Sequence, residues 1–155
     1  MTMASTGDNS RAALIAALNG TLADYLAPYV KTKNFHWHVA GPRFRDLHLM
    51  FDEQAAQLIA QVDLIGERVR KNGAATLTSI GAVAGGTVIA NQDNTSLDAD
   101  TMVAELMADN ATLLGRLRAV KQAAEEASDY ATSGAVDGWI DEAEERVWFL
   151  GQVLK

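Results

Sequence analysis

Five side chains of the types that bind transition metals lie close together in the sequence. They are His36, His48, Asp52, Asp63 and Glu67. His48 and Asp52 are four residues apart, as are Asp63 and Glu67, so each pair would share one face of a helix. Imidazole and carboxylate ligands together suit a redox-active divalent metal such as iron, and zinc and manganese also accept them. The pattern makes these residues candidates for a metal site.

Helix geometry divides positions 48–67 into two half-sites. At about 100° per residue, His48, Asp52, Asp63 and Glu67 all fall on one broad side of a helix. Along the axis, however, positions 48 and 63 are about 22 Å apart, which is too far for one metal ion to bridge. The second pair also repels itself, and Arg68 or a bound cation could offset that repulsion.

Two copies of this helix can complete both half-sites. If they pack antiparallel across a two-fold axis near residues 57 and 58, His48 lies level with Glu67 of the partner subunit, and Asp52 lies level with Asp63 of the partner subunit. A two-fold contact has this reciprocal form. His36, near the predicted end of the preceding helix, is well placed to join His48. The expected result is two identical sites at each dimer interface, both shared between subunits.

Helical periodicity predicts the elements that carry these residues. The first helix is expected over about 10–39, and the second from Pro42, which suits the first helical position, to about Gly73. A third helix is expected to begin at Asp98 or Asp100 and to run to about 127. The apolar residues of the second helix recur at steps of three and four, as a bundle helix requires: Phe44, Leu47, Phe51, Ala55, Leu58, Val62, Ile65 and Val69.

The connections complete the predicted topology. Residues 73–97 are too long for an ordinary loop and read as a crossover along a bundle, with a short helix near 77–84. The segment SDYATSG at 128–134 is predicted to be a turn before the last helix. No strand pattern competes. The expected fold is all-α, a ferritin-like four-helix bundle with a long crossover that carries a short helix between the second and third helices.

Composition sets outer limits on function. The chain has 155 residues, no cysteine and a formal net charge of −7. This length fits one domain, expected at 10–155 after a flexible tail of residues 1–9. Without cysteine, disulfides, thiolate metal sites and cysteine nucleophiles are excluded. No apolar run approaches a membrane span and no signal peptide is visible, so a soluble cytoplasmic protein is expected.

The usual intra-bundle di-iron site does not fit the histidines. Such a site needs Glu-x-x-His on two helices. The residues three before the histidines are Lys33, Phe35 and Arg45. A metal site in a ferritin relative of this sequence must therefore lie elsewhere.

A specific resemblance supports that conclusion. The segment KTKNFHWHVAGPRFRDLHLMFDEQ, followed by VDLIGER, closely resembles the Dps family of mini-ferritins. The family pattern is His-Trp, a second histidine twelve residues on, an aspartate four later, and then Asp-x-x-x-Glu-Arg. The matching positions are His36-Trp37, His48, Asp52, Asp63 and Glu67-Arg68.

The resemblance implies a function. It implies a hollow homododecamer whose two-fold interfaces carry ferroxidase sites, with His36, His48 and Asp52 from one subunit and Asp63 and Glu67 of the partner subunit. Members of the family oxidise Fe(II), preferentially with hydrogen peroxide, and store Fe(III) inside, which protects DNA.

Other residues have more than one interpretation. Trp37 is either an interface aromatic or an electron or radical donor, and His38 is an additional ligand or a surface residue. The iron-entry pores of the family are often acidic, which makes Asp129, Asp137 and Asp141 candidates beside an ordinary solvated face.

Two other functions remain open at this stage. One is a nucleoid-associated, DNA-binding or structural shell with a vestigial metal site, and the other is a bundle adaptor with a structural zinc. Residues 1–10 contain no Lys or Arg, so direct DNA binding through a basic tail is not expected.

Overall fold

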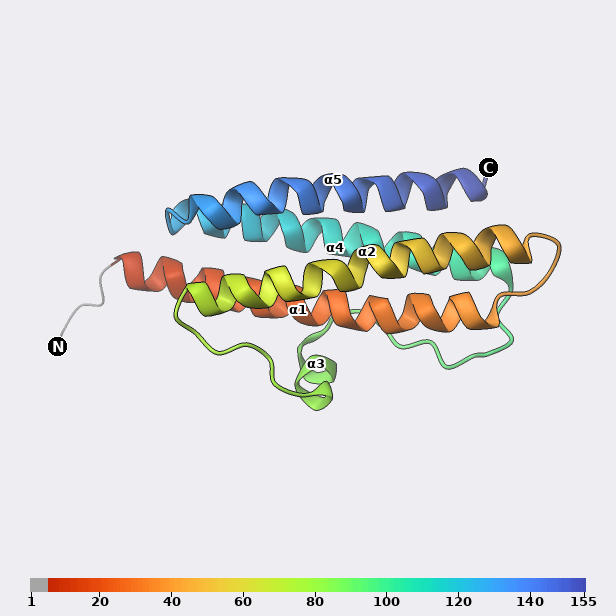
Figure 1. Ribbon diagram of the computed structural model, residues 1–155, viewed down its shortest axis with the longest axis horizontal. Helices are drawn as coiled ribbons and strands as arrows, with labels where there is room; N and C mark the ends of the chain where they lie inside the picture. The colour runs from red at the N-terminus through yellow and green to blue at the C-terminus, as the bar shows by residue number, and fades with distance from the viewer. Residues whose placement is uncertain (1–5) are drawn as a thin grey trace.

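The structure is a computed structural model that describes residues 6–155, with side chains from residue 9 onward. Four long helices form a bundle: α1 (Thr6–His38), α2 (Phe44–Lys71), α4 (Ala99–Glu126) and α5 (Tyr130–Val153). The short helix α3 (Ile80–Gly86) lies outside the bundle against α1 (Figure 1). Residues 6–155 contain no strand, so the predicted all-α fold is confirmed.

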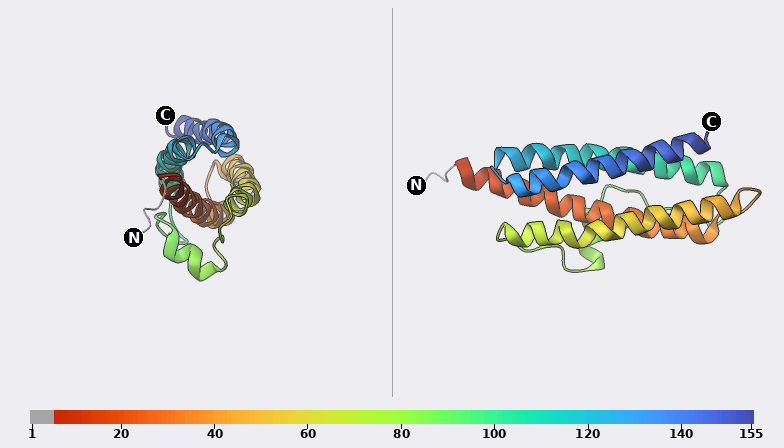
Figure 2. Two further views of the ribbon diagram at one scale, coloured as in Figure 1. Left: turned by 90° about the vertical axis from the view of Figure 1, so that its left-hand side faces the viewer. Right: turned by 45° about the horizontal axis from the view of Figure 1, so that its top comes forward.

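The topology follows from the long crossover. α1 and α2 form one antiparallel hairpin and α4 and α5 form another, while α2 and α4 run in the same direction (Figure 1). The segment between α2 and α4 therefore returns along the whole bundle, as predicted. Seen end-on, the four helices surround a common core and α3 projects from one side (Figure 2).

Periodic apolar residues fill that core. Leu47, Phe51, Leu58, Ile65 and Val69 of the predicted α2 stripe are buried, whereas Phe44 at its start is 42 % exposed. The predicted stripe of α4 is wholly buried, at Met102, Leu106, Leu113, Leu117, Val120 and Ala124. Because these positions face inward, the metal-binding residue types of α2 are left on its outer side.

Several predicted boundaries change. Of the predicted tail 1–9, residues 1–5 lie outside the described part of the chain, while α1 already begins at Thr6. α2 begins at Phe44, so Pro42 lies in the preceding turn, where the Phe44 amide donates to Gly41 O at 3.0 Å. The short helix predicted near 77–84 is present over Ile80–Gly86, because the Ser79 hydroxyl caps the amide of Ala82.

The prediction of a turn over 128–134 is wrong beyond residue 129. α5 begins at Tyr130, because the Asp129 carboxylate accepts a hydrogen bond from the Thr132 amide and caps the first turn. The reversal occupies residues 127–129, within which Ser128 has a positive φ of 56°. At the other end of the crossover, Asp98 and not Asp100 caps α4, through the Thr101 amide.

One buried carboxylate attaches the crossover to the bundle, in addition to hydrogen bonds from Asn19 to Ala75 O and from Asn34 to Gln92 O. Asp24 of α1 is fully buried and accepts hydrogen bonds from the Thr87 hydroxyl at 2.7 Å and the Val88 amide at 2.9 Å. Its other oxygen lies 3.1 Å from Nε of Arg116 on α4. A single side chain therefore connects α1, α4 and the segment after α3.

Candidate metal centre

Two buried neighbours position the histidines. Phe35 and Leu47 belong to an apolar cluster at the α1–α2 turn, and each precedes a histidine in the sequence. The Phe35 and Phe51 rings lie 6.4 Å apart within this cluster. Anchoring of α1 and α2 in this way brings His36 and His48 to the same edge of the hairpin, as the spacing predicted.

His36 and His48 form a stacked pair. Their ring centroids are 3.8 Å apart and the ring planes differ by 13°. Nδ1 of His36 lies 2.6 Å from the carbonyl oxygen of His48, and Nδ1 of His48 lies 2.7 Å from the carbonyl oxygen of His36. Each backbone carbonyl thus holds the other residue's ring.

These contacts determine the tautomer of both rings. A carbonyl oxygen can only accept a hydrogen bond, so both Nδ1 atoms must carry the proton. In the neutral form, Nε2 of His36 and of His48 then bears the free lone pair. An Nδ1–H bond to a carbonyl is the usual means by which proteins orient a metal-binding imidazole. The pair is therefore prepared to donate through two Nε2 atoms.

Asp52 lies beside this pair and is held by a lysine. One of its oxygens is 3.8 Å from Nε2 of His36 and 2.7 Å from Nζ of Lys33. The hydrogen bond from Lys33 lowers the pKa of the Asp52 carboxyl. Asp52 is thus an anionic group that remains 53 % exposed and turned toward the histidines.

The second half-site lies toward the other end of α2. Asp63 and Glu67 are both exposed, and neither makes an ion pair or a side-chain hydrogen bond with the part of the chain that the structure describes. Because α2 is continuous over Phe44–Lys71, Asp63 lies about 22 Å from His48 along the helix axis, as the helix geometry predicted. Within the described part of the chain, no lysine or arginine therefore forms an ion pair with either carboxylate.

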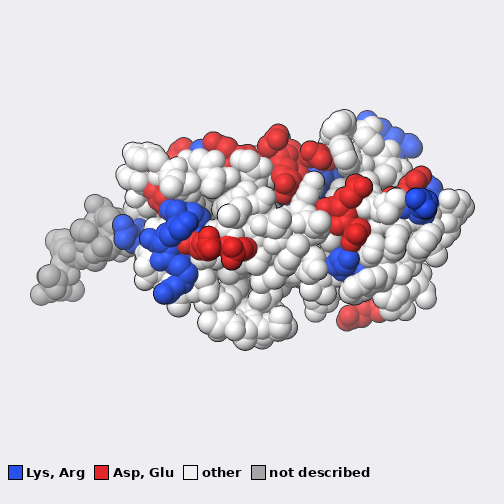
Figure 3. All heavy atoms as spheres, viewed as in Figure 1, with Lys and Arg blue, Asp and Glu red and all other residues white. Residues whose placement is uncertain are grey.

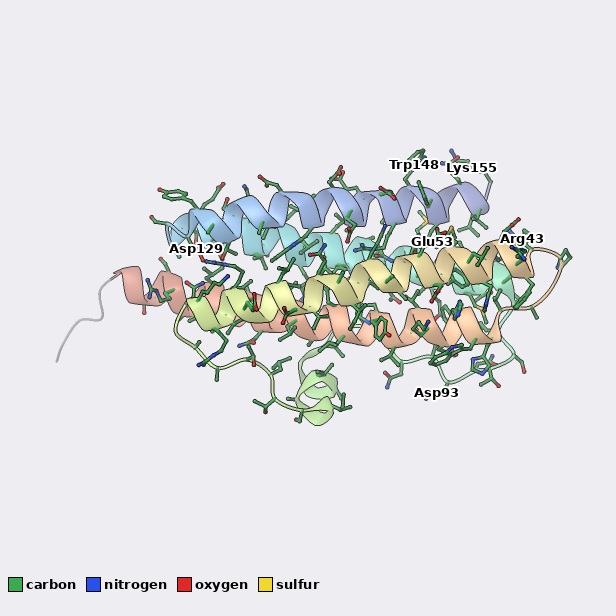
Figure 4. All side chains as sticks on the ribbon, viewed as in Figure 1. Arg43, Glu53, Asp93, Asp129, Trp148 and Lys155 are labelled. Atoms are coloured by element: carbon green, nitrogen blue, oxygen red, sulfur yellow. The ribbon has the colours of Figure 1, made fainter. Side chains whose placement is uncertain are left out.

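Arg68 does not offset the repulsion between Asp63 and Glu67, although the sequence offered it as one of two groups that could. Its Nη2 lies 2.9 Å from both oxygens of Asp129, and its Nε donates to the Thr132 hydroxyl at 2.7 Å. Burial alone would raise the pKa of Asp129, but hydrogen bonds from Thr132, Asn72 and Arg68 hold it well below its usual range. Asp129 therefore joins the end of α2 to the start of α5 (Figure 4).

The pore candidates have different surroundings. Asp129 is occupied by the contacts just described, with a side chain only 12 % exposed, so it does not present a free carboxylate. Asp137 is exposed and lies 2.9 Å from Nζ of Lys121. Asp141 is exposed on α5 and lines a shallow hollow with Glu144, Glu145 and Trp148. In Figure 3, acidic side chains follow the edge of the molecule where α5 lies.

Trp37 and His38 lie on the outer side of the turn. Trp37 is 63 % exposed, with Nζ of Lys33 5.8 Å from its ring centroid. Nδ1 of His38 contacts the backbone and side-chain oxygens of Asn34, at 2.9 and 2.8 Å. His38 therefore does not join the stacked pair within the subunit.

One subunit does not contain a complete centre. Among residues 6–155, no group of three or more His, Asp or Glu side chains is close enough to hold a metal ion. The contact of Lys33 with Asp52 was not predicted from the sequence, where Lys33 was noted only as the residue three before His36. Its position three residues before His36, on the same helical face, is the signal that could have revealed it.

Comparison with known proteins places the fold in a family. Residues 15–155 match the family described as Ferritin-like domain. A DNA protection during starvation protein of Brevibacillus brevis is 32 % identical over 138 residues, which cover 89 % of this chain and 92 % of that protein. The chain belongs to the Dps family of ferritin-like proteins.

Other similar proteins match nearly the whole chain. A Dps crystal structure from Bacillus brevis has a TM-score of 0.88 at 29 % identity and covers 99 % of this chain and 100 % of that one. A Dps structure from Vibrio cholerae O1, described as a member of a broad superfamily of ferritin-like diiron-carboxylate proteins, has a TM-score of 0.89 at 29 % identity, with 95 % and 92 % covered. An uncharacterized low temperature-induced protein of Nostoc is 36 % identical over 152 residues, covering 96 % of this chain and 83 % of that protein.

No helix among the described residues is long and apolar enough to cross a bilayer.

Proposed function

We propose that this Dps protein is a ferroxidase and iron store whose substrate, Fe(II), binds between two subunits. The observation that carries the proposal is the complementarity of two half-sites, one formed by the ends of α1 and α2 that meet at their turn and the other near the opposite end of α2. One presents two oriented imidazoles and Asp52, and the other presents Asp63 and Glu67, which have no ion-pair partner among the described residues. Neither is a credible metal site alone, whereas together they supply the mixed imidazole and carboxylate donors that suit iron.

The outer face of α2 supports a two-fold contact. Leu49, Ile59 and Leu64 are 40–48 % exposed, although all three are large and apolar. By helix geometry Ile59 lies on the same side as His48, Asp52 and Asp63. Exposed apolar side chains around a candidate site are typical of a surface that another protein covers. A second copy, packed antiparallel about residues 57 and 58, would cover them.

In the proposed site each residue has a definite role. Nε2 of His36 and of His48 would donate to iron, as would the Asp52 carboxylate, with Asp63 and Glu67 of the partner subunit completing the ligands. There would be two such sites at each dimer interface. Trp37 is a candidate electron or radical donor beside His36. In the net reaction two Fe(II) ions give two electrons to one hydrogen peroxide molecule, which takes up two protons and leaves as two molecules of water.

The finer parts of the proposal come from the family. We infer a cytoplasmic homododecameric shell that stores the Fe(III) product, with the acidic residues of α5 as candidates for contact with entering iron or mineral. The name of the Brevibacillus relative refers to DNA protection. Here we propose protection by removal of Fe(II) and peroxide, without direct DNA binding, because the chain carries a formal charge of −7.

Iron uptake by purified apoprotein tests this function. Fe(II) and hydrogen peroxide are added, the particles are separated by size exclusion, and iron and hydroxyl radical are measured. The proposal predicts many irons in a shell-sized peak, with little radical. The matched variant Asp63→Asn/Glu67→Gln should assemble normally but oxidise iron at close to the protein-free rate. Native oxidation rates in that variant would contradict the ligand assignment, and iron precipitating outside the shell with the native protein would leave a structural shell as the better account.

A further inference from the structure

A fully buried arginine lies between the four helices. Arg146 of α5 is 1 % exposed and is the largest of the fully buried side chains among the described residues. Charged side chains are almost never buried so completely unless they are paired. The core of this bundle therefore contains a permanent positive charge that the interface site does not use.

Oxygen atoms from three helices surround the guanidinium group. Nε of Arg146 donates to Oδ1 of Asn110 at 2.7 Å. Nη1 donates to Oε1 of Gln57 at 3.2 Å and to Oε1 of Glu142 at 3.3 Å. Because the Asn110 amide nitrogen donates to Leu106 O at 2.8 Å, its oxygen is oriented toward the arginine.

The fourth helix contributes Tyr25, which is fully buried near the same group. Burial raises the pKa of its phenol to about 12, although the nearby Arg146 acts in the opposite direction. The Tyr25 hydroxyl and Nη2 of Arg146 are buried polar atoms without a hydrogen-bond partner. Among the described residues, Glu142 is the one carboxylate that contacts Arg146, and it also accepts from Gln61 at 3.3 Å.

This arrangement has the form of a metal site with a different cation in it. Ferritin-like di-iron proteins hold their metals in the bundle core, between carboxylate and histidine side chains of all four helices. Here the same kind of space receives polar groups from all four helices, but with one carboxylate, amide oxygens and a phenol. A hard divalent ion could use such oxygens, but a guanidinium group already occupies their centre.

We propose that Arg146 is a built-in cation that closes the interior of each bundle to divalent metal, and so restricts iron binding to sites outside the bundle core. Its charge balances Glu142, and its fork of N–H donors satisfies the oxygens that would otherwise attract a metal ion. Loss of the guanidinium group would leave an acidic, oxygen-lined cavity that accepts one small cation.

The test is a manganese titration of variants in the Asp63→Asn/Glu67→Gln background, so that interface binding does not contribute. Arg146→Ala should bind one additional Mn(II) ion per subunit, counted from the loss of free Mn(II) signal in electron paramagnetic resonance. Arg146→Lys keeps the positive charge and should bind no additional ion. Millimolar guanidinium, far below denaturing levels, should displace the manganese from Arg146→Ala and raise the melting temperature of that variant. Guanidinium should have neither effect on Arg146→Met.

A folded Arg146→Ala variant with the manganese count of its background would overturn the proposal. A second measurement does not depend on the folding of any variant. Crystals of the native protein soaked in Mn(II) should show no anomalous peak between the four helices, and a peak beside Glu142 would overturn the proposal. Both outcomes are independent of whether the interface oxidises iron.

Discussion

His36 and His48 hold each other through their backbones. Each ring donates from Nδ1 to the other residue's carbonyl oxygen, at 2.6 and 2.7 Å, and the rings stack at 3.8 Å. One carbonyl belongs to α1 and the other to α2, so the orientation of both Nε2 atoms depends on the α1–α2 turn. Both contacts lie within one subunit and fix the orientation of the two rings, which reduces the cost of ordering these ligands.

The ligand role of this pair can be separated from its structural role. In His48→Asn, the amide nitrogen can replace the Nδ1–H donor to the His36 carbonyl, but the Nε2 lone pair is lost. We expect normal folding and Fe(II) oxidation at least about tenfold slower, the scale on which metal sites lose activity when their coordination is disturbed. His38→Asn is the matched control and should oxidise iron normally. Equal rates for the two variants would remove His48 from the site.

The contact of Lys33 with Asp52 predicts competition with the metal. Nζ of Lys33 lies 2.7 Å from the oxygen that also faces His36. Lys33→Gln removes a positive charge that repels divalent ions, so Co(II), used as a redox-inert probe, should bind several-fold more tightly. Lys155→Gln, an exposed lysine that the proposed site does not include, controls for the general change in charge. Weaker Co(II) binding in Lys33→Gln would show that the lysine orders Asp52 for the metal instead of competing with it.

The lowered pKa of Asp129 leads us to expect a loss of stability in acid. The pKa of Asp129 is held below its unfolded value of about 3.9, so its charge stabilises the fold above that pH and the contribution disappears as pH falls through the folded pKa. Asp129→Asn keeps a residue that can cap α5 but loses the charge. Its melting temperature should lie below that of the native protein at pH 7, and the difference should shrink below about pH 4. A difference that is constant from pH 7 to pH 3 would contradict this assignment.

The hydrogen bonds of Asp24 are expected to hold the crossover against the bundle and to protect it from proteolysis. Asp24→Ala leaves the Thr87 hydroxyl and the Val88 amide without their acceptor, which typically costs about 1–3 kcal/mol for a buried group. Because the loss is local, limited proteolysis should cut within residues 87–97 well before the long helices. Asp93→Asn, in the same segment but exposed, should be cut at the native rate. Unchanged cleavage in Asp24→Ala would mean that the other contacts of the crossover, among them the hydrogen bonds of Gln92 with Asn34 and Glu105, hold it without Asp24.

The sequence predicts the long elements of this fold because they depend on local periodicity. The buried faces of α2 and α4, the crossover and the approach of His36 to His48 all follow from spacing. The start of α5 does not, because SDYATSG has the composition of a turn while Thr132 and Ser133 are in fact buried in a helix. The signal was Asp129 three residues before Thr132, an N-cap pattern that turn composition obscured.

Pairings between distant residues could not be predicted in the same way. The partner of Arg68 is 61 residues away and depends on how the helices pack. A lone charged residue in an amphipathic helix is expected on the surface, and Arg146 is at the centre because three helices supply its acceptors. Tertiary packing, which leaves no periodic signal, decides these contacts.

The most direct test of the shared centre is complementation between two inactive variants. One variant carries His36→Ala and His48→Ala, and the other carries Asp63→Asn and Glu67→Gln. In a mixed dimer, one of the two sites has both of its halves intact, so random co-assembly should restore about a quarter of the native Fe(II) oxidation rate. Each variant alone, or the two mixed after separate assembly, should stay inactive. Restoration on co-assembly is the predicted result, and its absence in mixed particles of native size would contradict a site shared between subunits.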